Sequence, residues 1–108
     1  MRIEALKYRT EDNNDIMIYV NFLDSYVGEK RWDIAEIRYK TSRQRNYRNF
    51  SDTFKDSYEY RHLDYDKRDE YKLKKFEEFV GREKLQEALI AAWEMIKPDI
   101  DNIFIGVV

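Results

Sequence analysis

The chain contains no cysteine, and this absence removes several chemistries at once. Disulfides, thiolate nucleophiles and cysteine-based zinc sites are all impossible without it. A reducing compartment suits a chain of this kind, so a cytoplasmic location is expected.

Glycine and proline are scarce, with three glycines and one proline in 108 residues. With glycine only at positions 28, 81 and 106, neither a P-loop nor a dinucleotide-binding fingerprint can be written. The nucleophile-elbow signature Gly-x-Ser-x-Gly is missing as well. The single histidine, His62, would need a serine and an acid close in space to form a triad. These absences favour a protein that is not an enzyme and that uses no cofactor.

Long apolar runs are also missing. No segment approaches the roughly 20 apolar residues that a bilayer-spanning helix needs. The opening stretch MRIEALKYRT lacks the apolar core of a signal peptide. We therefore expect no membrane association and one compact domain over residues 1–108, a size that buries roughly two-thirds of the unfolded chain's surface.

Charge and aromatic side chains are what the chain has in quantity. Charged residues make up 39% and aromatic residues 16%, including nine tyrosines, while the formal net charge is only -2. Disordered segments are poor in aromatic residues, so this composition indicates a folded domain with a densely charged surface.

Three segments, 2–9, 16–23 and 31–40, are typical of β-strands. The clusters 11–15 and 24–30 that separate them are rich in turn-forming residues, which predicts an antiparallel meander. The middle strand is apolar at nearly every position, and this predicts a central strand covered on both sides. In the third strand the apolar positions change parity near Ala35, which indicates a β-bulge or, alternatively, helix.

Helices are predicted next. Phe50, Phe54 and Tyr58 recur every four residues, which favours a helix over 51–62 with Ser51 or Asp52 as its cap, although a strand over 57–63 is the alternative. A second helix is predicted over 66–80, capped by Asp64 or Asp66 and ended by Gly81. The clearest apolar stripe predicts a third helix over 82–97, which Pro98 should end.

The apolar segment 99–108 is predicted as a final strand that pairs in the sheet. Strands and helices are segregated along the chain, so the expected class is α+β. The expected fold is an antiparallel sheet of three N-terminal strands plus a C-terminal strand. Two to three helices, about 51–62, 66–80 and 82–97, pack on one face of it, with Phe76 and Trp93 in the core.

The segment KTSRQRNYRNF, residues 40–50, holds four basic residues and no acid. Guanidinium groups grip phosphates in pairs of hydrogen bonds, and exposed rings offer stacking surfaces for unpaired bases. One hypothesis is therefore a nucleic-acid binder that contacts phosphates through residues 38–48, although a pI of about 5.5 counts against it. The acids of the stretch 52–70 could instead neutralise these arginines within the domain.

A protein partner explains the same residues at least as well, because interfaces are enriched in tyrosine, tryptophan and arginine. We predict a non-enzymatic protein-binding module, regulatory or inhibitory, or a chain that associates with itself. Small proteins of phages and other mobile elements, including inhibitors of host defence nucleases, share this size and type, a likeness of composition only. The predicted partner-binding residues are Arg38, Lys40, Arg43, Arg45, Tyr47, Arg48, Tyr58 and Tyr60.

Two catalytic patterns are weaker alternatives. His62, Asp64 and Asp66 would point the same way on an extended segment and form a plausible divalent-metal set. Asp24 with Glu36 and Arg38 resembles a nuclease arrangement, with arginine where lysine should stand. No catalytic or metal-binding residue is predicted from either pattern.

Overall fold

The computed structural model describes the chain apart from residues 25–29 and 106–108, and its side chains apart from 23–31 and 97–108. Most of the predicted loop 24–30 therefore lies outside the described residues. The class is α+β, as predicted, with one four-stranded antiparallel sheet. The elements are β1 (Arg2–Arg9), β2 (Asn14–Asp24), β3 (Lys30–Thr41), β4 (Arg48–Asn49), the 3₁₀ helix η1 (Phe50–Thr53), α1 (Tyr58–Arg61), α2 (Tyr65–Val80) and α3 (Arg82–Ile105).

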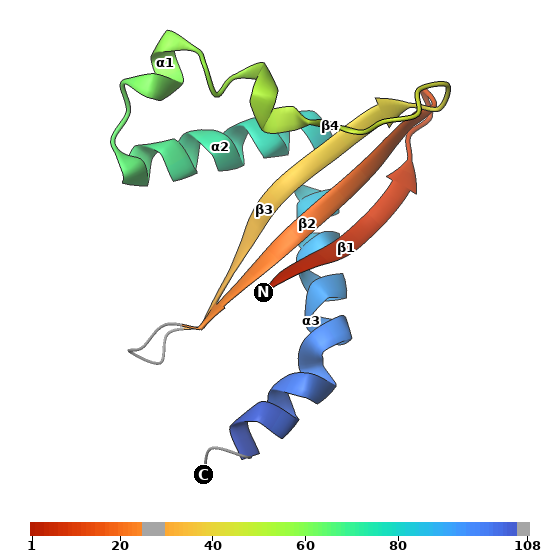
Figure 1. Cartoon of the computed structure of the whole chain (residues 1–108), viewed down its shortest axis with the longest axis vertical. Coiled ribbons are helices and arrows are strands. Elements are labelled where there is room, and N and C mark those ends of the chain that lie inside the picture. Colours follow the sequence, from red (N-terminus) through yellow and green to blue (C-terminus); the bar gives the residue numbers. More distant parts are fainter. Residues whose placement is uncertain (25–29, 106–108) are drawn as a thin grey trace.

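The sheet follows chain order, β1-β2-β3-β4, so the predicted meander is confirmed for the first three strands (Figure 1). The turn between β1 and β2 closes with the Asn13 amide on the Thr10 carbonyl at 3.1 Å. Asn13 has a φ of 62°, a left-handed conformation that asparagine tolerates better than most residues.

Both neighbours of β2 contain one extra residue, and both extra residues are alanines. Tyr19 pairs with Glu4 on β1, whereas Ile18 pairs with Leu6, which leaves Ala5 between them. On the other side, Tyr19 pairs with Glu36 and Val20 with Ile34, which leaves Ala35 out of register. The bulge predicted at Ala35 is confirmed, and the helical alternative is wrong.

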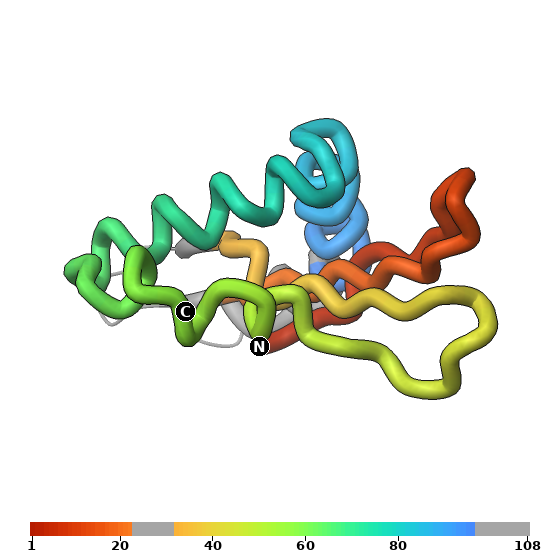
Figure 2. Tube along the Cα trace, turned by 90° about the horizontal axis from the view of Figure 1, so that it is seen from above, coloured from red at the N-terminus to blue at the C-terminus, as the bar shows by residue number. Residues whose placement is uncertain are grey.

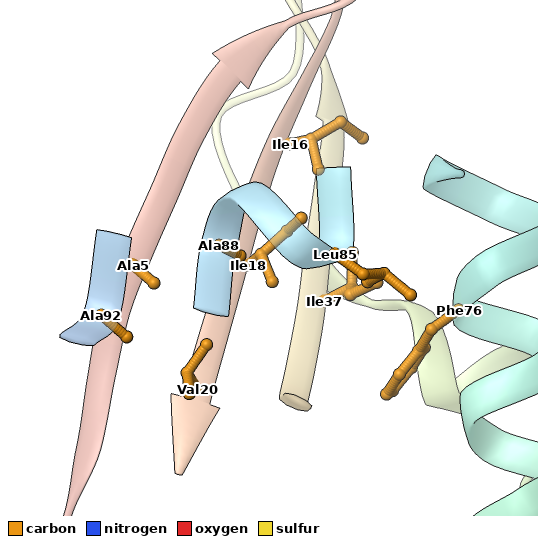
Figure 3. Close-up of a cluster of buried hydrophobic side chains, with 9 residues drawn as sticks. All are labelled: Ala5, Ile16, Ile18, Val20, Ile37, Phe76, Leu85, Ala88 and Ala92. Carbon is orange, nitrogen blue, oxygen red and sulfur yellow. The ribbon is translucent and has the colours of Figure 1, made fainter. Parts of the chain in front are cut away.

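The two longer helices, α2 and α3, lie on the same side of the sheet (Figure 2). Figure 3 shows the core between the sheet and these two helices, where aliphatic side chains of β2 and β3 meet Phe76 of α2 and Leu85 of α3. Ala88 and Ala92 are fully buried against the sheet, and their small side chains let α3 approach the strands closely. The buried residues of α3 recur with the helical period of 3.6, and they pack against every second residue of β2, the ones that face the core.

The junction between α2 and α3 depends on Gly81. Its φ of 90° and ψ of 153° lie in a region that is essentially restricted to glycine. Its amide still closes the last turn of α2 on the Glu77 carbonyl at 2.8 Å. Gly81 ends α2 as predicted. The change of chain direction at Gly81 lets α3 begin with the next residue, Arg82. Asp64 is the N-terminal cap residue of α2, although its side chain makes no capping hydrogen bond.

The predicted C-terminal strand is wrong, because α3 continues through Pro98 to Ile105. Proline removes one hydrogen bond but already has a helical φ, so it weakens a helix without always ending it. Extending a formed helix adds one hydrogen bond for each further residue, so the segment after Pro98 continues α3. The fourth strand is instead the short β4. No helix within the described part of the chain is long and apolar enough to cross a membrane.

Two burial predictions also need correction. Trp93 is 40% exposed, and its ring packs against that of Trp32 at 5.8 Å between ring centroids. The buried stripe of α3 runs along Leu85, Ala88, Ala92 and Ile96, so Trp93 lies at its margin. The expectation that β2 is covered on both sides is wrong too, because α2 and α3 both lie on one side of the sheet (Figure 2).

Residues 51–62 do not form one helix. Asn49 caps η1 and Ser57 caps α1, so the segment is a 3₁₀ turn and a single α-helical turn joined by a bend. The strand alternative over 57–63 is wrong as well. A cluster of rings holds this irregular segment against α2: Phe50 lies 4.2 Å from Phe79, and Phe54 lies 5.7 Å from Tyr71, between ring centroids.

Candidate binding surface

The connection between β3 and β4 forms a loop at one end of the sheet (Figure 1), and we call residues 41–48 the basic loop. Its base is fixed by hydrogen bonds that backbone amides donate. The Gln44 amide donates to the Thr41 carbonyl at 3.0 Å, and the Thr41 amide donates to Gln44 Oε1 at 3.1 Å. The Ser42 amide donates to the Asn13 carbonyl at 2.9 Å, which places the loop beside the β1–β2 turn.

Asp15 on β2 holds a cation from each neighbouring strand. Arg9 Nε donates to Asp15 Oδ1 at 2.8 Å, and Lys40 Nζ lies 3.0 Å from Asp15 Oδ2. The hydrogen bond from Arg9, followed by that from Lys40, lowers the pKa of the Asp15 carboxyl from 3.8 to about 2. Lys40 also donates to the Gln44 carbonyl at 3.1 Å. Lys40, a predicted binding residue, therefore anchors the base of the basic loop.

Three arginines of the basic loop differ from Lys40, because their side chains make no such contact in the described structure. The side chains of Arg43, Arg45 and Arg48 are exposed, and none forms a hydrogen bond, ion pair or ring contact with the residues that the structure describes. Tyr47, between them in sequence, is half-buried with the Lys40 ammonium 5.4 Å from its ring centroid. The acids of the stretch 52–70 leave these arginines unneutralised: Asp52 and Asp56, for example, pair with cations of their own segment.

Arg38 belongs to a cluster around the buried carboxylate of Glu36, whose side chain is 7% exposed. Glu36 accepts from Arg38 Nε at 3.0 Å, from Arg2 Nη1 at 3.0 Å and from Asn49 Nδ2 at 2.6 Å. The hydrogen bond to Glu36 raises the pKa of Arg38 above its usual value. A buried carboxylate without such donors would be strongly unfavourable, so this cluster ties β1, β3 and β4 together.

Tyr19 also lies within this cluster, although it is not among the residues predicted for the site. The guanidinium carbon of Arg38 lies 4.9 Å from the Tyr19 ring centroid, and that of Arg2 lies 6.0 Å from it. These are cation–π distances. The bulges at Ala5 and Ala35 put Glu4 and Glu36 directly across from Tyr19. The parity change at Ala35 was the one sequence signal that pointed to this position.

The strand residues on the side away from the helices form a mixed, charged surface, which we call the open face. Apolar side chains are few on it, and Met17 is shielded between Lys7 and Arg38 in the pairing of the strands. The open face is continuous with the basic loop because Lys40, on the open face, directly precedes the loop and donates to its Gln44 carbonyl. Its charged members are Arg2, Glu4, Lys7, Arg9, Asp15, Asp33, Glu36, Arg38 and Lys40.

Two of the three predicted tyrosines do not join the basic loop. Tyr58 and Tyr60 lie on α1, which Figure 1 shows well away from the loop between β3 and β4. Tyr58 is exposed and stacks on His62 at 3.8 Å between ring centroids. Tyr60 packs against Phe54 at 5.4 Å. The eight predicted residues thus form two separate groups.

Neither catalytic alternative gains support from the geometry. The described residues contain no group of three or more His, Asp and Glu side chains placed to hold a metal ion. His62 Nδ1 is instead 2.9 Å from the Tyr58 carbonyl oxygen. In the nuclease-like pattern, Glu36 is enclosed by two guanidiniums and an amide. The side chain of Asp24 lies outside the described residues.

No family model, no curated protein and no solved structure matches this chain. The physical evidence on function is therefore the distribution of paired and unpaired charge over the basic loop and the open face.

Proposed function

We propose that the chain is a small non-enzymatic module that binds a protein partner through the basic loop and the adjoining open face, and so regulates or inhibits that partner. The observation that carries the proposal is the state of Arg43, Arg45 and Arg48. All three are exposed and without a partner in the described part of the chain. Arginine combines a fixed charge with several donors, which makes it a frequent hot-spot residue of interfaces.

The base of the loop supports this role because it is already ordered. Lys40, Asp15 and the backbone of Gln44 are joined by hydrogen bonds and an ion pair. Ordering a loop on binding costs free energy, and a loop whose ends are fixed beforehand avoids part of that cost. The partner surface that this arrangement fits is one rich in exposed carboxylates.

The charges around the basic loop favour a protein over a polyanion. The β1–β2 turn, which contacts Ser42, carries Glu11 and Asp12, and both are exposed. The open face mixes acids such as Glu4 among its bases. A phosphate backbone would meet these carboxylates at close range, whereas a protein surface of mixed charge can complement them.

A nucleic acid is the second candidate, and one observation favours it: three unpaired guanidiniums and the ring of Tyr47 occur within six consecutive residues. Phosphate contacts would make the affinity fall steeply with salt, with a slope near one for each phosphate contacted.

The test is a quantitative pull-down from the source cell. The bait variants are wild type, the triple variant Arg43→Ala, Arg45→Ala, Arg48→Ala, and a control with equal charge loss on the helices, Lys67→Ala, Lys74→Ala, Arg82→Ala. We expect wild type and control to recover the same protein and the loop variant to lose at least tenfold of it. Equal recovery by all three would contradict the proposal.

Fluorescence anisotropy with labelled single-stranded DNA, duplex DNA and RNA at low salt separates the second candidate. The proposal expects no binding that depends on the three arginines. Tight binding that weakens steeply with salt, and that the loop variant loses, would replace the protein partner with a nucleic acid.

A further inference from the structure

The edge of the sheet carries a second candidate surface. β4 pairs with β3 only at Arg38 and Tyr39. Over residues 30–37, β3 is the last strand of the sheet, and no other strand within the described part of the chain pairs with it there. An unpaired edge presents backbone donors and acceptors that can receive another strand.

A cleft of about 670 Å³ lies along this edge, between β3 and α2. Figure 1 shows α2 projecting sideways past β3, so that its first turns stand clear of the sheet. Ile34 and Ala35 line the cleft on the strand side, together with Arg2, Asn21 and Asp33. Leu73, Phe76 and Lys72 line it on the helix side, next to the acids Asp66, Asp69 and Glu70. Ligand sites of proteins are commonly about 300–1,000 Å³, so the space suits a short peptide segment.

The helix wall of the cleft has a definite chemistry. Asp66, Asp69, Glu70 and Leu73 follow one another at i, i+3, i+4 and i+7, which is one face of α2. The three acids are exposed and have no ion-pair partner among the residues that the structure describes. Leu73 is 50% exposed, although it stands one turn before the fully buried Phe76. The wall therefore offers three carboxylates and one exposed apolar side chain against a single cation, Lys72, whose ammonium lies 5.6 Å from the Phe76 ring centroid.

We propose that the β3 edge and the α2 wall together bind an extended, basic segment of a partner protein, which adds to the sheet as a fifth strand. Backbone hydrogen bonds to β3 would supply affinity, and alternate side chains would supply specificity. Every second side chain of such a strand points toward α2, so lysine or arginine at these positions meets the three acids. This surface is separate from the basic loop, meets the open face at Arg2, and takes a ligand of opposite charge to that of the basic loop.

The bulge at Ala35 shapes this edge. An extra residue breaks the regular ladder and increases the local twist, a device that limits indiscriminate pairing of sheet edges. Pairing is therefore restricted to a short segment, and α2 above the edge leaves less room for a second sheet than for a single strand. These features select an isolated extended peptide over edge-to-edge pairing of two copies.

The probe for the test is a fluorescein-labelled seven-residue peptide of alternating valine and lysine. One comparison peptide replaces lysine with glutamate, and a second replaces valine with proline, which keeps the charge but cannot donate to a strand. We expect the lysine–valine peptide to bind at least tenfold more tightly than either. Equal binding of the proline peptide would reduce the interaction to charge alone and overturn the proposal, and so would absence of binding.

Variants of the chain then locate the site. The triple variant Asp66→Lys, Asp69→Lys, Glu70→Lys should lose at least tenfold in affinity for the peptide. The control Glu11→Lys, Glu83→Lys, Glu94→Lys, which changes the net charge equally at exposed positions outside the cleft, should bind as wild type does. Circular dichroism checks that both variants fold, and the neutral variant Asp66→Asn, Asp69→Asn, Glu70→Gln repeats the test if charge reversal disturbs α2. Equal losses in the cleft variant and the control would overturn the proposal.

Amide hydrogen exchange supplies the position of the bound strand. On saturation with the peptide, we expect slower exchange in residues 32–37 and no change in residues 43–48. Protection confined to the basic loop, or a peptide-free dimer that already protects the β3 edge, would contradict the assignment. Either result leaves the proposed function of the basic loop to its own pull-down test.

Discussion

The guanidinium of Arg38 lies 4.9 Å from the ring centroid of Tyr19 and at the same time donates through Nε to Glu36 at 3.0 Å. The face of the Arg38 guanidinium thus contacts a ring of the domain, and its edge donates to a carboxylate of the domain. Arg43, five residues further along, is exposed with no such contact in the described structure. The basic segment is therefore divided between residues that hold the sheet together and residues that remain available to a partner.

This division predicts opposite effects of two similar substitutions. Arg38→Ala removes two hydrogen bonds from the buried Glu36 carboxylate and should lower the free energy of unfolding by about 1–3 kcal/mol. Arg43→Ala removes no described contact and should change it by less than about 0.5 kcal/mol. Urea denaturation of both variants measures the difference, and equal stability losses would contradict the division.

The pKa of Asp15 makes part of the stability depend on pH. Its carboxyl has a pKa of about 2 in the folded chain against an ordinary value of 3.8. A lowered pKa stabilises the fold when the group is ionised, so this contribution is complete above about pH 4 and is lost as the pH falls toward 2. The urea midpoint of Asp15→Asn should therefore differ from wild type most above pH 4 and converge with it near pH 2.

The control for that experiment is Asp12→Asn in the neighbouring turn, an exposed acid with no ion pair in the described structure. Its midpoint should follow wild type at every pH. A parallel pH dependence in both variants would show that the effect is one of net charge rather than of the Arg9–Asp15–Lys40 contacts.

Substitutions of Phe76 and Leu73, which both lie on α2, should differ in their effect on stability. Phe76 is 1% exposed at the centre of the core, and Phe76→Ala should cost about 3–5 kcal/mol of stability. Leu73→Ala, one turn earlier at a half-exposed position, should cost less than about 1 kcal/mol. Thermal and urea unfolding of the two variants measures the difference. A stability loss for Leu73→Ala close to that for Phe76→Ala would mean that α2 is rotated about its axis relative to the sheet.

Gly81 predicts a purely backbone effect. A Cβ placed there meets nothing within 4 Å, so steric crowding does not oppose a side chain. The φ of 90° with ψ of 153° does oppose it, and Gly81→Ala should cost about 1–3 kcal/mol. An alanine variant as stable as wild type would show that the α2–α3 junction adopts another conformation.

The features that the sequence predicted are those with a local signal. The apolar run of β2, the parity change at Ala35 and the stripe of α3 each follow from the periodicity of neighbouring residues, and the structure contains all three. The C-terminal strand failed because isoleucine and phenylalanine favour strands by propensity, while the helix that precedes them extends through Pro98 instead. The prediction that Trp93 lies in the core failed because this residue is at the margin of the apolar stripe.

The candidate surface was predictable only in part. The richness of residues 38–48 in arginine was visible, but which arginines are engaged depends on strand register. Arg38 meets Glu36 and Tyr19 only because two bulged alanines align three strands at that position. The two-residue strand β4 carries no periodic signal at all, so the unpaired β3 edge and the cleft under α2 could not have been read from the chain.

Arginine-selective modification with phenylglyoxal, mapped by peptide mass spectrometry on the chain alone and on the chain bound to its captured partner, tests the central claim most directly. The free chain should react quickly at Arg43, Arg45 and Arg48 and slowly at Arg38, and the partner should protect those three loop arginines. Slow reaction of the loop arginines in the free chain, or unchanged reaction in the complex, would contradict the account.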